Sequence, residues 1–258
     1  MKTSITKLTL FTFILSSAFL FAGQSRLNQD DLLEGIRLAE KALKAYDKDL
    51  LVQAKEIFAK EESNTMAFYY QTYCEYKLLE MSLRPGNEDL FDKYYEDAVA
   101  HAEQIAAVKE YESEGKTLLA GIYMMKIATN SMSAVTLSPK VHSLLDDAQK
   151  SDPGNPRPYI IRGTMKYQTP GIFGGSYEDA AKNFSKAIQL FEKQENVDPL
   201  KPHWGYIESL AWLGRSQEKL ENYDAAKFAY EKALKVEPNY GWVKYSLLPQ
   251  LMKKLNDK

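Results

Sequence analysis

Cysteine is nearly absent from this sequence, in which Cys74 is the only one among 258 residues. A single cysteine cannot form a disulfide within its own chain, so packing alone must stabilise the fold. Histidine is almost as scarce, and His101, His142 and His203 stand far apart, without the spacing of a zinc site. We therefore expect neither a metal site nor a cofactor.

A charge of one predominant sign is also lacking. The 33 basic and 35 acidic residues give a net charge of −2, so no global field attracts nucleic acid, and we expect no nucleic-acid partner. The sequence has no Gly-Lys-Ser/Thr loop, nucleophile elbow or His-Glu-x-x-His motif. We predict that the protein is not an enzyme. A hydrolase whose Ser, His and Asp come from distant positions is the least favoured alternative.

The N-terminal segment differs from the rest of the chain. Two lysines precede an apolar run at 8–22 that is too short to cross a bilayer comfortably. The pattern is typical of an export signal at 1–25, cleaved after Ala22 or after Ser25, and an uncleaved anchor is the alternative. No cysteine stands near the cleavage site to carry a lipid. We expect a bacterial periplasmic or secreted protein that contacts membranes only through this signal.

Beyond the signal, the sequence is periodic. Residues 177–188 recur, with conservative changes, at 223–234, and repetition at this scale predicts a stacked helical array. The apolar spacing is helical, and no alternating strand pattern appears. Ser138 and Pro139 have the pattern of a helix cap followed by a first-turn proline, which predicts a helix start at 138. We predict one all-α domain at 26–258, with helix pairs at 29–46 and 48–61, 64–82 and 87–108, 111–129 and 138–151, 156–168 and 176–195, and 203–220 and 222–236, closed by a capping helix at 239–256.

The last pair carries a specific residue pattern. It places Leu, Gly, Ala, an aromatic residue, Ala and Pro at set intervals, namely Leu210, Gly214, Ala226, Tyr230, Ala233 and Pro238. The pattern resembles the tetratricopeptide repeat, although Gln217 stands where that family usually has an aromatic residue. The match is strongest at 156–236. The chain also resembles uncharacterised exported bacterial tetratricopeptide proteins with a Phe-Gly-Gly loop. The resemblance implies a right-handed α-solenoid of about five antiparallel helix pairs, and a non-catalytic scaffold whose concave groove binds a peptide or protein segment.

The first helix of each pair lines the concave groove in such an array. The groove candidates on these helices are Tyr69, Tyr73, Tyr76, Arg157, Tyr167, Glu208, Trp212, Arg215 and Lys219. Tyr69, Tyr73 and Tyr76 share one stripe of their helix, which is compatible with a binding platform or with a core face. Trp204 and Trp242 flank the last pair, and we expect them to staple the capping helix.

A glycine-rich loop at 169–176 interrupts the fourth pair. We predict a structural turn, with Phe173, Gly174 and Gly175 as a lip beside a ligand as the alternative. A phosphate site is disfavoured because acidic residues open the helix that follows. The loop also resembles the Gly-Gly turn in the T-component proteins of periplasmic uptake systems. That likeness implies an alternative function, a solute-binding accessory protein with a small-molecule pocket near this loop.

Overall fold

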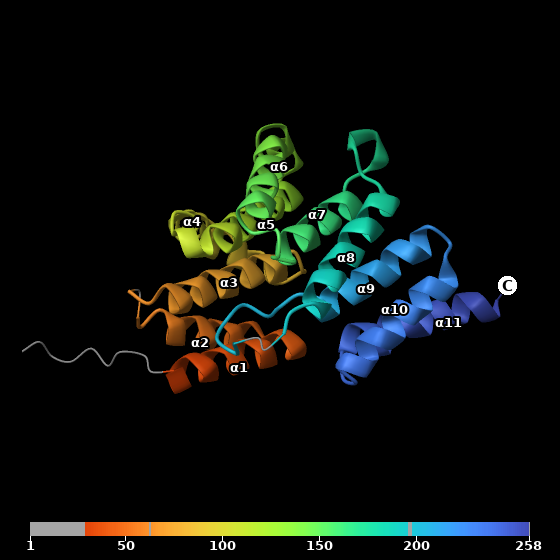
Figure 1. The fold of residues 1–258 in the computed structure, drawn as a ribbon, viewed down its shortest axis with the longest axis horizontal. Coiled ribbons are helices and arrows are strands. Elements are labelled where there is room, and N and C mark those ends of the chain that lie inside the picture. Colours follow the sequence, from red (N-terminus) through yellow and green to blue (C-terminus); the bar gives the residue numbers. More distant parts are fainter. Residues whose placement is uncertain (1–28, 62, 196–197, 258) are drawn as a thin grey trace, which may run out of the picture.

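The computed structural model describes residues 29–61, 63–195 and 198–257, which contain eleven α-helices and no strand (Figure 1). The predicted export signal at 1–25 lies outside the described residues. The all-α prediction is confirmed. The helices are α1 (Gln29–Ala45), α2 (Lys48–Phe58), α3 (Thr65–Ser82), α4 (Asp89–Ala106), α5 (Glu112–Thr129), α6 (Ala134–Ser151), α7 (Arg157–Gln168), α8 (Tyr177–Glu192), α9 (Tyr206–Lys219), α10 (Tyr223–Val236) and α11 (Leu248–Asn256).

Consecutive helices pack in pairs, from α1 with α2 to α9 with α10. In three of these pairs a glycine on the first helix admits an aromatic ring from the second, namely Gly35 with Phe58, Gly163 with Phe184 and Gly214 with Tyr230. A Cβ at Gly163 would lie 2.8 Å from the Phe184 ring, and one at Gly214 would lie 2.3 Å from the Tyr230 ring. Both rings are fully buried. The repeated pattern is therefore the close-packing surface within each pair, as the sequence predicts.

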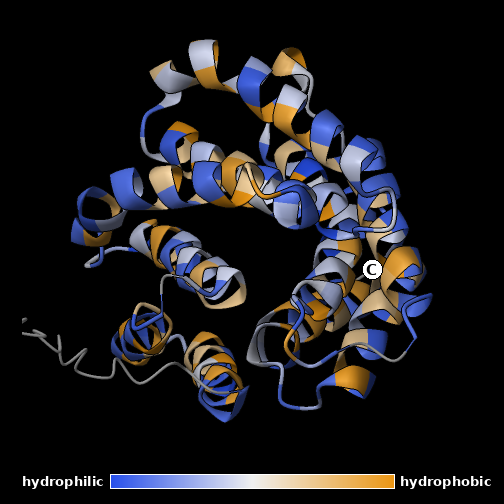
Figure 2. Cartoon of the chain, turned by 60° about the vertical axis from the view of Figure 1, so that its left-hand side comes forward, coloured by the Kyte–Doolittle hydropathy of each residue, from blue (hydrophilic) through white to orange (hydrophobic). Residues whose placement is uncertain are grey.

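The first helices of the pairs form the inner layer of a curved array. Contacts join α3 to α5, α5 to α7 and α7 to α9, whereas α4, α6 and α8 make no comparable contacts with one another among the described residues. A wall whose first helices touch while its second helices spread apart curves towards the first helices. Figure 2 shows the helices following one another along a curve. We call the side of α1, α3, α5, α7 and α9 the inner face.

The start of α6 differs from the prediction. The helix begins at Ala134 and contains Pro139 in its interior, whereas the sequence predicts a start at 138. A short 3-10 turn, Ser131–Ser133, leads directly into the helix, and Asn130 caps that turn through a 3.1 Å hydrogen bond from a backbone N–H. The predicted start was wrong because the capping residue of this segment is Asn130.

The predicted capping helix is present in two parts. A π-helical turn, Val243–Leu247, runs into α11. Leu247 and Leu251 pack in one cluster with residues of α9 and α10, including Leu210. The capping segment thereby covers the apolar face of the last repeat, which would otherwise be exposed to water. Among the described residues, no helix is both long enough and apolar enough to cross a bilayer.

Candidate interaction surface on the inner face

The connection between α8 and α9 crosses the inner face. After α8 the chain runs over to α1 and then returns to α9 (Figure 1). We call its residues 198–204 the strap. Leu200 and Trp204 of the strap pack against the largest core cluster, and the Tyr70 hydroxyl donates a hydrogen bond to the Lys201 carbonyl at 3.0 Å. The strap therefore fills part of the surface on which a bound peptide would lie.

A chain of hydrogen bonds fixes the strap to α3, α5 and α7. Trp204 Nε1 donates to the Tyr69 hydroxyl at 2.8 Å, and that hydroxyl donates to Glu114 Oε2 at 3.1 Å. Arg157 donates to Glu114 Oε1 at 2.8 Å and also to the Pro202 carbonyl. Burial raises the pKa of Glu114, and the Arg157 charge opposes the shift. The buried ion pair thus has the hydrogen bonds that a buried charge requires.

Ring stacking and a surface ion pair add to these contacts. Trp204 stacks on Tyr73, with ring centroids 5.2 Å apart and planes inclined by 20°. His203 Nε2 lies 2.7 Å from Glu40 Oε1 on α1. This hydrogen bond raises the pKa of His203 and lowers the pKa of Glu40, so both groups are charged in the range between the two values.

The structure places four of the groove candidates in the core or beneath the strap. Tyr69, Tyr73 and Tyr76 are at most 5% exposed, and Arg157 is 3% exposed. The prediction of an open groove at these positions was therefore wrong, because the tyrosine stripe is a core face. The reason is a long-range one, because the strap that covers Tyr69, Tyr73 and Arg157 lies far along the chain from α3. Trp204, expected to staple the capping helix, belongs to the strap instead.

Three other candidates meet further along the inner face, where Tyr167 is buried at 8% exposure and Trp212 and Arg215 are partly exposed. Tyr167 from the end of α7 and Trp242 from the capping segment both lie edge-on to Trp212 of α9, with ring centroids 5.1 and 5.3 Å apart. The guanidinium carbon of Arg215 lies 4.8 Å from the ring centroid of Tyr167, 4.6 Å from that of Trp212 and 5.5 Å from that of Trp242. We call these four residues the Arg215 patch. Cation–π contacts of this kind are each worth about 0.5–2 kcal/mol, so they hold the guanidinium in place.

Arg215 is partly exposed and forms no ion pair with a carboxylate of the described residues. Glu218, on the next turn of the helix, accepts a hydrogen bond instead from the hydroxyl of Tyr230 on α10 at 2.5 Å. Lys219 extends the positive charge along α9, with its Nζ 5.8 Å from the ring centroid of Tyr177. An aromatic floor with an unpaired guanidinium is suited to hold a carboxylate beside an apolar side chain.

Glu208, the remaining groove candidate, faces α3. Burial raises the pKa of Tyr73, and the Glu208 charge adds to that shift. Burial alone would lower the pKa of Lys77, but the charges of Glu80 and Glu208 outweigh it and raise that pKa. Glu208 therefore belongs to a charged group beside α3, apart from the Arg215 patch.

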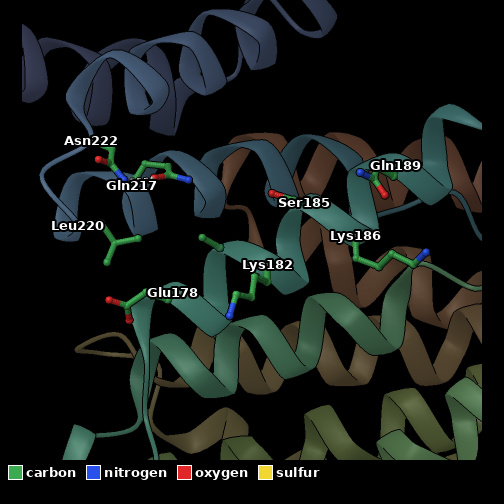
Figure 3. A pocket seen from close by; sticks show the side chains of 9 residues that line it. Glu178, Lys182, Ser185, Lys186, Gln189, Gln217, Leu220 and Asn222 are labelled. Atoms are coloured by element: carbon green, nitrogen blue, oxygen red, sulfur yellow. Dashed lines mark hydrogen bonds between the residues drawn. The ribbon is translucent and has the colours of Figure 1, made fainter.

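Two surface hollows are open to solvent. One of about 490 Å³ lies between α8 and the end of α9, where Glu178, Lys182 and Gln217 are among its lining residues (Figure 3). The other, of about 460 Å³, lies along α1 beside Arg37 and Lys41. Neither is the enclosed pocket that a small-molecule receptor needs. Within the described ranges, no group of His, Cys, Asp or Glu is arranged to hold a metal ion.

The glycine-rich loop stands beside the Arg215 patch without joining it. Phe173 is 75% exposed, and Gly174 has a φ of +89°, which favours glycine. A Cβ at Gly175 would lie 1.7 Å from a carbonyl oxygen at the start of the loop. Only Tyr177, after the loop, reaches the patch, at 5.3 Å from the Tyr167 centroid. The structural-turn prediction fits this geometry, and a ligand-contacting lip stays a prediction.

Sequence reasoning missed the strap. Two signals indicate it in retrospect. The connection from 193 to 205 is long for a helical repeat, and it contains Trp204, whose large ring is costly to leave in water. Neither signal says which helices the strap contacts, because the curvature of the array decides that.

The fold and the inner face define a class of protein, a curved helical-repeat scaffold. Within that class, residues 207–240 match the family model of the tetratricopeptide repeat. The chain therefore carries a tetratricopeptide repeat and has the tetratricopeptide-repeat type of fold. This fold commonly mediates protein–protein interaction and typically serves as a non-catalytic scaffold.

Two solved structures share the fold. The HusA haemophore from Porphyromonas gingivalis has a TM-score of 0.62 and 20% identity, over 76% of this chain and 96% of its own. TTC0263, a thermophilic tetratricopeptide-repeat protein from Thermus thermophilus, has a TM-score of 0.59 and 16% identity, over 88% of this chain and 98% of its own. No curated protein matches the sequence. At these identities the two structures show similarity of fold alone.

Proposed function

We propose that the protein is a non-catalytic periplasmic or secreted scaffold that binds a segment of a partner protein at the Arg215 patch. One observation carries the proposal: the Arg215 guanidinium lies 4.6–5.5 Å from three aromatic ring centroids and has no carboxylate partner in the described part of the chain. A segment with an acidic residue next to an apolar one would supply what the patch lacks.

The energetics favour a segment of this kind. The three rings already hold the guanidinium and shield it partly from water, so little side-chain freedom remains to be lost on binding. A carboxylate that reaches Arg215 would form charge-assisted hydrogen bonds worth about 1.5–3 kcal/mol. The rings of Trp212 and Trp242 offer rigid apolar contact area, which is typical of the residues that dominate binding interfaces.

The rest of the inner face is less suited to binding. The strap occupies the surface of α3, α5 and α7 that carries Tyr69, Tyr73 and Arg157. A partner there would have to break the Trp204 and Pro202 contacts, which are intramolecular and so favoured by a high effective concentration. The Arg215 patch needs no such displacement.

An extracytoplasmic location is part of the proposal. It rests on the signal-like pattern at 1–25, which lies outside the described residues.

Peptide binding tests the function. We would measure the fluorescence anisotropy of a labelled peptide library in which Glu or Asp flanks Leu or Phe, and of the same library with Gln or Asn in the acidic positions. The acidic library should bind, and Arg215→Met should weaken it about tenfold or more, the equivalent of one charge-assisted hydrogen bond. Arg37→Met, which removes an exposed arginine of α1, is the matched control and should leave binding unchanged. Equal binding of both libraries, or an unaffected Arg215→Met variant, would contradict the proposal.

A further inference from the structure

Two turns expose large apolar side chains that no other part of the described chain covers. Met132 and Val135, where the chain passes from α5 into α6, are each 77% exposed. Ile172 and Phe173, between α7 and α8, are 87% and 75% exposed. Both turns project from the same edge of the molecule, at the top of Figure 1. Exposed apolar residues gathered in this way indicate a contact surface, whereas scattered ones need no explanation.

The turn that carries Ile172 and Phe173 is held in a defined conformation by hydrogen bonds. Backbone hydrogen bonds close it on both sides, from Gly175 N to the Pro170 carbonyl at 3.2 Å and from Ser176 N to the Lys166 carbonyl at 3.0 Å. Lys166 Nζ also donates to the Gly174 carbonyl at 2.9 Å. A turn whose backbone groups are satisfied at its base holds the two apolar side chains in a defined place.

The sequence around the first turn lacks acidic residues. No Asp or Glu occurs at 115–145, and Lys126 and Lys140, on either side of this turn, form no ion pair within the described part of the chain. The arginines near the second turn add no free charge, because Arg157 is buried against Glu114 and Arg162 pairs with Asp146. The positive charge of this edge therefore lies at the first turn.

The acidic residues nearest to this edge lie beside the second turn. Asp179 lies 3.9 Å from Lys166 and 3.5 Å from Lys182, and the exposed Glu178 accepts a hydrogen bond from the Ser176 hydroxyl. Asp146 pairs with Arg162 at 2.6 Å and lies about 18 Å along α6 from the first turn, at 1.5 Å per helical residue. The second turn therefore contributes apolar contact, and the positive charge comes from Lys126 and Lys140 beside the first turn.

We propose that this edge docks onto the surface of an anionic lipid bilayer, with Ile172 and Phe173 entering the interfacial region and Met132 and Val135 beside them. A bilayer accepts separate projecting apolar tips without a complementary pocket, whereas a protein partner would have to match both turns in shape. Basic residues close to an anionic surface strengthen binding by about fivefold each. The contact is independent of the Arg215 patch and adds to the membrane contact expected from the export signal.

Site-specific labelling tests the docking on the full chain. Cys74 is fully buried, so Phe173→Cys and the control Phe228→Cys each offer one accessible thiol for an environment-sensitive fluorophore. Phe228 is 66% exposed and belongs to α10, away from the two turns. With phosphatidylglycerol–phosphatidylcholine vesicles, the label at 173 should shift to the blue and the label at 228 should not. Pure phosphatidylcholine or about 0.5 M salt should weaken the shift several-fold.

Vesicle sedimentation with unlabelled protein gives the second readout. The double variant Ile172→Ser/Phe173→Ser should lower the partition coefficient on anionic vesicles at least tenfold relative to the unaltered chain, and Phe228→Ser should leave it unchanged. Because every variant retains the same N-terminal segment, that segment contributes equally to all of them. An equal shift at 173 and 228, or undiminished binding of the double variant, would overturn the proposal. The proposal would also be overturned if the protein bound no vesicles and the double variant lost binding to a protein partner, because the turns would then form a protein interface. Peptide binding at Arg215 should persist in the double variant.

Discussion

Replacing Trp204 with alanine should destabilise the fold by about 3 kcal/mol, because three separate contacts of the strap depend on the indole ring. The Nε1 hydrogen bond to Tyr69 at 2.8 Å contributes about 1 kcal/mol, and the stack on Tyr73 at 5.2 Å about 1 kcal/mol more. The Arg157 guanidinium lies 5.4 Å from the indole centroid and adds about 1 kcal/mol. The sum lies at the lower end of the range for truncating buried tryptophans, as expected for a ring that is only partly buried.

Trp204→Phe separates the hydrogen bond from the packing. Phenylalanine keeps most of the stack on Tyr73 but has no donor for the Tyr69 hydroxyl, which still donates to Glu114. We expect a loss of about 1–1.5 kcal/mol. Urea unfolding followed by far-ultraviolet circular dichroism measures both variants, and Phe228→Ala, at a 66% exposed position, is the control. Equal values for the alanine and phenylalanine variants, or a loss below about 1 kcal/mol for alanine, would refute this account of the strap.

Three further predictions concern the fold. Gly214→Ala should destabilise by about 1–2 kcal/mol in the same urea assay, because the new Cβ would lie 2.3 Å from the Tyr230 ring and the strain exceeds the gain in helix propensity. The His203–Glu40 pair should contribute most to the free energy of unfolding between about pH 4.5 and 6.5. The contribution is lost at higher pH as His203, whose pKa is raised, loses its proton. It is lost in acid as Glu40, whose pKa is lowered, gains one. His203→Gln should therefore cost more at about pH 5.5 than at about pH 8.5, by less than about 1 kcal/mol because both side chains are partly exposed. Burial raises the pKa of Cys74, so the thiol should react with a disulfide reagent only as fast as the protein unfolds, and rapid reaction in the native state would contradict its placement.

Local features of the fold could be predicted from the sequence. The helix pairs follow from apolar spacing and turn residues, and the Gly163 and Gly214 contacts follow from a residue pattern within one pair. The start of α6 was predicted wrongly because Asn130, which precedes Ser138 in the chain, caps the turn that leads into this helix. Apart from the start of α6, prediction was reliable where neighbours in the sequence decide the structure.

The site was predictable only in part, because its outcome depends on long-range packing. Helical periodicity shows that Tyr69 and Tyr73 share a face, but it cannot show that the strap returns to cover that face. The same periodicity placed Tyr167, Trp212 and Arg215 on first helices, and there the structure brings them together. Trp242 joined this group although the sequence assigned it only to the capping helix.

The three tryptophans allow a direct test of where a partner binds. Trp204 lies in the strap, whereas Trp212 and Trp242 belong to the Arg215 patch, so their indole N–H signals in an NMR spectrum report the two halves of the inner face separately. During titration with an acidic–apolar peptide selected by anisotropy, the signals of Trp212 and Trp242 should shift while that of Trp204 stays in place, and Arg215→Met should abolish the shifts. A shift of Trp204 alone, or shifts that survive Arg215→Met, would contradict binding at the Arg215 patch.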